Sequence, residues 1–243
     1  MPALLPLSLA IALAAIHVFG WRLRFLSVLP RSAWLSFAGG TSVAYVFVHL
    51  LPEMAALQEA LAERVAGFEL FEARHVWLLA LAGLVAFYGL EHLASRSREE
   101  GEDEAMDRTG AGVFWVHMAS YGVYNVLVGY LLAWGESRTT SGVLLFALAM
   151  AFHFVVNDTG LRHDHKERYL HVGRWLLAGA VVLGCGLGFV TEVSEATIAA
   201  LLGILGGSVI LNVLKEELPE ERESRFWPFL AGAVAYSALL LLV

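Results

Sequence analysis

The chain has 243 residues, of which 58% are hydrophobic and only 16% are charged. This composition excludes a soluble globular domain of this size and predicts an integral membrane protein whose surroundings are the lipid bilayer. The net charge of −7 and the few Lys and Arg residues argue against nucleic acid as a partner, and the single cysteine, Cys185, excludes both a disulfide framework and a cysteine-based zinc site.

Eight apolar runs of about membrane-spanning length follow one another along the chain. We therefore predict an all-α integral membrane fold with eight transmembrane helices in a single polytopic domain, residues 1–243. The charged stretch 95–111 is expected to be an acidic, flexible cytoplasmic loop. The predicted spans are Leu4–Gly20, Ala33–Leu51, Val76–Leu93, Gly112–Trp134, Gly142–Val156, Val172–Val190, Ala196–Leu214 and Phe226–Val243.

The basic residues predict the orientation of these spans. The odd-numbered loops hold thirteen Lys and Arg residues, whereas the even-numbered loops hold three. Cytoplasmic loops of membrane proteins are enriched in Lys and Arg. We therefore expect the odd loops to be cytoplasmic and both termini to lie outside the cell (inner or plasma) membrane.

One sequence pattern occurs twice. Gly39-Gly40 leads to Leu51-Pro52-Glu53, and Gly206-Gly207 leads to Leu218-Pro219-Glu220 at the same interval. With the predicted orientation, these two copies cross the bilayer in opposite directions, which is typical of inverted-repeat transporters. The pattern predicts a 3+2+3 architecture with helices 1–3 and 6–8 around helices 4 and 5, although two glycine-containing apolar helices could also match by chance.

The two central spans carry polar residues at helical spacing. In the fourth span they recur every four residues, and the same step appears at the end of the fifth. Polar groups inside a membrane are costly, and imidazole with amide and carboxylate oxygens suits a divalent cation such as zinc. Interhelical hydrogen bonding is the alternative. We expect the two histidines to face each other at similar depth; the candidate ligands are His117, Tyr121, Asn125, His153, Asn157 and Asp158.

Further candidates lie at the ends of predicted spans. His49 and Glu53 stand four residues apart at the outer end of the second span and could form an entrance site, or Glu53 could be solvated. His163 and His165 fall in the predicted fifth loop and could pass a metal to the cytosol, or belong to an ordinary polar loop. Four residues are expected to be solvated or interfacial: His17, His75, Glu91 and His92.

Three features resemble the ZIP (zinc/iron-regulated transporter-like) family: eight helices with both termini outside, the segment His49-Leu50-Leu51-Pro52-Glu53, and the later Leu218-Pro219-Glu220. The resemblance covers the whole chain and is that of a divergent prokaryotic-type member. In that family, helix four carries His-Asn-x-Pro-Asp/Glu-Gly and helix five carries His-Glu-x-Pro-His/Glu-Glu-x-Gly, which together line a metal site. This chain keeps the histidines and glycines but loses most of the carboxylates. The corresponding segments read His117-Met118-Ala119-Ser120-Tyr121-Gly122 and His153-Phe154-Val155-Val156-Asn157-Asp158-Thr159-Gly160.

The resemblance implies a transporter that moves zinc or a similar divalent cation inward, with His117 and His153 as ligands and Asp158 as a helper. Too few carboxylates remain to offset two divalent ions, so we expect at most one metal. No catalytic residues are expected, and a homodimer is compatible with the sequence. A membrane-embedded metal-dependent hydrolase and a non-transporting ZIP-like sensor or assembly protein are the alternative hypotheses.

Overall fold

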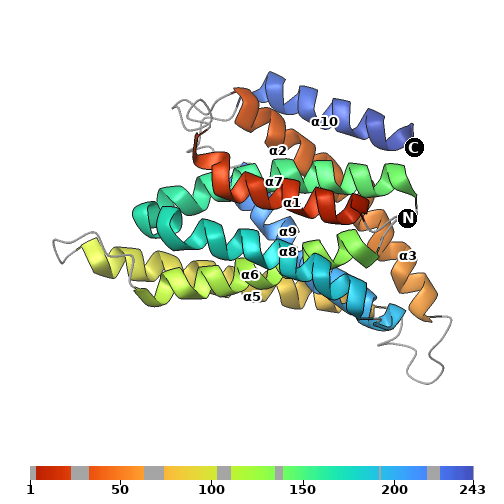
Figure 1. Ribbon diagram of the computed structural model, residues 1–243, viewed down its shortest axis with the longest axis horizontal. Coiled ribbons are helices and arrows are strands. Elements are labelled where there is room, and N and C mark those ends of the chain that lie inside the picture. Colours follow the sequence, from red (N-terminus) through yellow and green to blue (C-terminus); the bar gives the residue numbers. More distant parts are fainter. Residues whose placement is uncertain are drawn as a thin grey trace.

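The computed structural model describes residues 4–22, 33–62, 74–102, 111–134, 139–191, 193–217 and 225–242, and all regular structure in these ranges is helical (Figure 1). The all-α prediction is confirmed. In the bundle, α2 and α10 lie on one side, α5 and α6 on the other, and α1 and α7 between them (Figure 1). The helices are α1 (Leu4–Phe19), α2 (Ala33–Tyr45), α3 (Leu51–Ala62), α5 (His75–Glu102), α6 (Ala111–Trp134), α7 (Thr140–Arg168), α8 (Arg174–Val190), α9 (Glu195–Glu217) and α10 (Phe226–Leu241), with η1 (Gly20–Arg22), η3 (Val46–Leu50) and η4 (Tyr169–Gly173) as short 3₁₀ or π segments.

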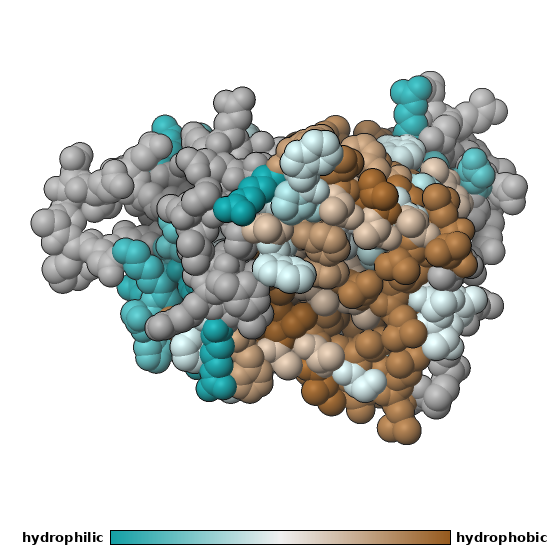
Figure 2. Space-filling model, turned by 90° about the horizontal axis from the view of Figure 1, so that it is seen from above, coloured by the Kyte–Doolittle hydropathy of each residue, from teal (hydrophilic) through white to brown (hydrophobic). Residues whose placement is uncertain are grey.

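Five helical segments in the described ranges are long and apolar enough to cross a membrane, and the shorter α10 is also apolar. One of the five, Thr140–Val190, contains both α7 and α8. Figure 2 shows hydrophobic residues over much of the described face, with hydrophilic residues gathered mainly toward one end. Large hydrophobic side chains such as Leu81, Leu183 and Val234 are exposed, as a bilayer-facing surface requires. The chain is an integral membrane protein.

A π turn joins α2 to α3 without ending the helix. The amide of Leu51 donates to the carbonyl of Val46, five residues back. Pro52 follows directly, and proline both lacks an amide hydrogen and collides with the carbonyl four residues earlier. The extra residue of a π turn relieves such a clash. His49 lies in this turn, so the predicted entrance residue stands at a break in regular helix.

The largest correction to the predicted elements concerns residues 157–171. We expected a loop there, but α7 continues to Arg168 and η4 leads directly into α8. The reversal between α7 and α8 (Figure 1) occurs at Lys166, whose φ of 42° is the only positive value among described non-glycine residues. The polar run resembled a solvated loop in the sequence because its burial against other helices is a property of the tertiary structure.

Two other helices are longer than their apolar runs. α5 extends to Glu102 instead of ending at Leu93, so residues 95–102 of the predicted acidic loop are helical. Residues 103–110 of that loop lie outside the described residues. The second predicted span is also longer, because α3 continues it from Leu51 to Ala62.

Glycines set the closest helix contacts. A Cβ on Gly40 in α2 would collide with the carbonyl oxygen of Phe229 in α10, and one on Gly207 in α9 would collide with that of Ala80 in α5. The contacts are reciprocal, because Gly232 in α10 meets the Phe37 carbonyl and Gly83 in α5 meets that of Ile204. Without a hydrophobic driving force between helices in lipid, such close packing is a main source of association.

Gly40→Ala and Gly207→Ala are each expected to lower the free energy of unfolding in detergent by about 1–3 kcal/mol, because the added methyl meets rigid backbone. Gly179→Ala is the matched control, since no described atom outside its own stretch of helix lies within 4 Å of a Cβ built there. Thermal unfolding of the purified variants measures the effect. A Gly179→Ala loss as large as that of Gly40→Ala would contradict this account of the packing.

Candidate polar site between α1, α6, α7 and α9

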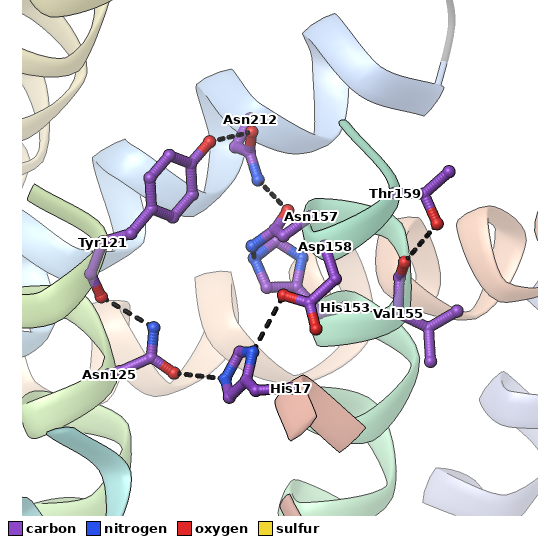
Figure 3. Close-up of polar contacts among 9 residues, drawn as sticks. All are labelled: His17, Tyr121, Asn125, His153, Val155, Asn157, Asp158, Thr159 and Asn212. Carbon is purple, nitrogen blue, oxygen red and sulfur yellow. Dashed lines mark hydrogen bonds and ion pairs between the residues drawn. The ribbon is translucent and has the colours of Figure 1, made fainter. Parts of the chain in front are cut away.

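A chain of hydrogen bonds crosses three helices in the bundle interior (Figure 3). The Tyr121 hydroxyl on α6 donates to Asn212 Oδ1 on α9 over 3.2 Å, and Asn212 Nδ2 donates to Asn157 Oδ1 on α7. Asn157 Nδ2 in turn lies 3.0 Å from His153 Nε2. All four side chains are at least 94% buried.

A second branch, centred on His17 of α1, joins α1 to α6 and α7 (Figure 3). His17 Nδ1 lies 2.8 Å from Asp158 Oδ1, and its Nε2 lies 2.9 Å from Asn125 Oδ1. His17 is 2% exposed and packs against Phe154, with the ring centroids 4.5 Å apart and the ring planes tilted by 34°. We had expected His17 to be interfacial, and that prediction is wrong.

The hydrogen-bond partners of His17 place a hydrogen on its Nε2. Asn125 Nδ2 is 2.6 Å from the Tyr121 carbonyl, which can only accept, so Asn125 turns its Oδ1 toward His17. His17 Nε2 therefore carries a hydrogen. The contact between His17 Nδ1 and Asp158 Oδ1 also needs one, on either the ring or the carboxyl group. In both cases the His17–Asp158 pair has no net charge, as burial favours.

The orientation of the Asn157 amide makes His153 Nε2 a hydrogen-bond acceptor, so the His153 ring is neutral. Because Asn157 Oδ1 accepts from Asn212, it is the Nδ2 group of Asn157 that faces His153 Nε2. The Nε2 lone pair is therefore occupied by an amide hydrogen. A metal could bind this nitrogen only after Asn157 turns, and the turn would present the Asn157 carbonyl oxygen as a second ligand.

A separate cluster surrounds His117. Its Nδ1 lies 2.8 Å from His165 Nε2, and its Nε2 lies 3.8 Å from Glu91 Oε1. Glu91, expected to be solvated, has a side chain only 14% exposed. His117 stands between the other two groups, so the three side chains form a line from α5 through α6 to α7. In this arrangement their donor atoms do not converge on one point.

The two histidines that we expected to face each other lie at different levels. His153 packs beside Tyr124, with ring centroids 5.6 Å apart, whereas His117 packs beside His165. Tyr124 is seven residues from His117, which corresponds to about 10 Å along α6. The predicted ligand set is thus divided into a His153 level, with Asn157 and Asn212, and a His117 level, with His165 and Glu91.

The predicted entrance and exit residues have different environments. His49 and Glu53 are both half-buried, and the His49 ring lies 5.4 Å from that of Tyr45. The predicted exit pair is split, because the His163 side chain is 85% exposed beside Asp164 while His165 is buried against His117. Among the described residues, no group of three or more His, Cys, Asp or Glu side chains is arranged to hold a metal ion.

Sequence reasoning missed three participants: His17, Glu91 and Asn212. Asn212 stands inside the apolar run 196–214, where an amide is itself a signal of interhelical bonding. His17 was present as an ionisable group within a predicted span, which marks a candidate by the same criterion used for His117. The sequence does not show which helices pack against α1 and α9.

Comparison with known proteins gives one relevant similarity. The chain is 24% identical over 206 residues to the zinc transporter ZIP13 of Pongo abelii. The match covers 85% of this chain but 56% of that relative, so the chain spans little more than half of its length. No protein-family model matches the chain.

Tyr121→Phe is expected to lower the free energy of unfolding by about 1–3 kcal/mol, because Asn212 Oδ1 loses its donor in a buried site. Tyr124→Phe is the matched control three residues away and should cost less, since among the described residues its hydroxyl bonds only to the Met150 sulfur, at 3.4 Å. Denaturation of both purified variants checks the difference. Equal losses would show that the interhelical chain adds nothing to stability.

Proposed function

We propose that this protein is a divergent, prokaryotic-type ZIP-like transporter that carries zinc or a similar divalent cation across the cell membrane. The observation that carries the proposal is the buried polar network on α6 and α7, at the positions where the ZIP-like motifs occur. His153, Asn157 and Asp158 lie within it. The similarity to a zinc transporter over most of the chain supports the same cargo.

The proposed topology has eight spans. In it, α2, η3 and α3 form one rod, and α7 is separated from η4 and α8 by the reversal at Lys166. The labelled N and C ends lie at the same end of the bundle (Figure 1), which an even number of crossings requires. The bias of basic residues favours placing both ends outside the cell.

The glycine contacts support the proposed inverted repeat. Gly40 and Gly207 occupy corresponding positions in the repeated sequence. Gly40 packs on α10 and Gly207 packs on α5, so each contacts a helix of the other repeat. The partners correspond as well, since Phe37 and Ile204 each stand three residues before those glycines and meet Gly232 and Gly83. A pseudo-twofold axis relating helices 1–3 to 6–8 would produce this correspondence. Leu218-Pro219-Glu220 lies outside the described residues.

For the metal itself, we propose one central site at the His153 level. Rotation of Asn157 frees His153 Nε2 and supplies an amide oxygen, and Asp158 supplies the negative charge. His117, His165 and Glu91, about 10 Å away along α6, form a further station on the cytoplasmic side. We interpret this arrangement as the closed state of the proposed site, because His153, Asn157 and Asp158 each bond to another side chain.

One observation favours the runner-up function, a non-transporting ZIP-like sensor or assembly protein. The polar groups of the His153 level satisfy one another without a cation, as they would if the network served only to hold helices together. Metal flux separates the two functions.

Purified protein reconstituted in liposomes with an internal zinc-sensitive dye tests the proposal. We expect zinc uptake by the wild type, and at least a tenfold loss of uptake with His153→Ala, since one bound imidazole supplies well over the ~1.4 kcal/mol that tenfold represents. His163, predicted from the sequence as an exit residue, is left out of the proposed path because its side chain is 85% exposed, so His163→Ala is the control and should transport normally.

Absence of wild-type uptake would overturn the transporter proposal and favour the non-transporting relative. Undiminished uptake by His153→Ala would reject the assigned ligand while leaving transport itself in place.

A further inference from the structure

His17 is the residue through which α1 reaches the polar network. It bonds at both ring nitrogens, to Asp158 on α7 and to Asn125 on α6, partners 141 and 108 residues away in sequence. The ring also packs against Phe154 at a tilt of 34°, and it is almost completely buried. A side chain that served only to fill space in α1 would need neither contact.

His17 also determines the direction in which Asp158 points. His153 and Asn157 are four residues apart and share one face of α7, whereas Asp158 lies about 100° further round the helix, toward α1. Its Oδ1 is bonded to His17 there. The acid is thereby kept off the face that presents the proposed metal ligands His153 and Asn157.

The carboxyl group is only half satisfied in this position. Its Oδ2 is buried and makes no hydrogen bond of normal distance and angle among the described residues, although the Tyr169 hydroxyl lies close enough to interact with the carboxyl group. A buried acceptor left without a donor is energetically costly. Among the described residues, the bond to His17 is the side-chain hydrogen bond of normal geometry that holds Asp158, in a position from which a cation would draw it away.

We propose that His17 is a positioning residue that restrains Asp158, and with it Asn125, away from the transported cation. This inference rests on the proposed function and extends it by a residue on α1. When a divalent cation arrives, Asp158 leaves His17 as a carboxylate to offset the ion's charge, and the shared proton stays on the His17 ring. When Asp158 returns to His17, the ion loses its anionic ligand and is released. His17 thus weakens metal binding and speeds turnover.

The test combines zinc binding to the purified full-length chain, by calorimetry, with uptake in liposomes. In His17→Ala the competing partner is gone, so we expect zinc to bind about tenfold more tightly, the effect of one charge-assisted hydrogen bond. Maximal uptake should fall together with KM, because release is no longer assisted. A merely structural lesion would lower maximal uptake without tightening binding.

Two further variants keep the test decisive. His17→Gln retains amide donors and should fall between wild type and His17→Ala, which also covers the case in which the alanine variant does not fold. In an Asp158→Asn background, where zinc binds more weakly, His17→Ala should cause no further tightening, because His17 acts through Asp158. His163→Ala controls for loss of a surface histidine.

The outcomes separate this inference from the function on which it rests. Wild-type protein that neither binds nor transports zinc overturns both. Wild-type transport with unchanged or weaker zinc binding in His17→Ala and His17→Gln overturns the role of His17 alone. Tightening that persists in the Asp158→Asn background would show that His17 does not act through Asp158.

Discussion

A polar group that this chain places among its membrane helices is costly unless it finds a partner inside the protein, because lipid supplies none. That constraint organises the centre of the bundle. Four helices contribute one connected set of side chains. The Tyr121 carbonyl, which can only accept, sets the orientation of Asn125, and the orientation of the Asn212 amide sets that of Asn157. Protonation and side-chain orientation at His17 and His153 are consequences of the same accounting.

The fold class and most helices could be predicted from the sequence, because apolar runs long enough to span a bilayer leave few other structures open. The run 112–134 differs from α6 by one residue at its start. Prediction failed where a polar run is buried by other parts of the chain. Residues 157–168 resemble a loop by composition, and only contacts with α1, α6 and α9 make Asn157, Asp158 and His165 interior residues.

The residue types of the candidate site could be predicted from the sequence, but not which of these residues lie next to one another. Four-residue spacing placed Asn157 correctly beside His153, since both lie on one helix. Spacing within helices carries no information on the relative depth of two helices, so the pairing of His117 with His153 was wrong and that of His117 with His165 was not foreseen. Long-range partners such as His17 and Asp158 depend on how α1 packs on α7, which spacing along one helix does not specify.

The central claim is that this hydrogen-bonded network is the closed form of a metal site. X-ray absorption at the zinc edge, recorded on purified protein loaded with one equivalent of zinc, tests it most directly. The account predicts a nitrogen and oxygen shell with imidazole scattering that loses one imidazole in His153→Ala and is unchanged in His163→Ala. Failure to retain stoichiometric zinc, or a spectrum that His153→Ala leaves unaltered, would contradict the claim.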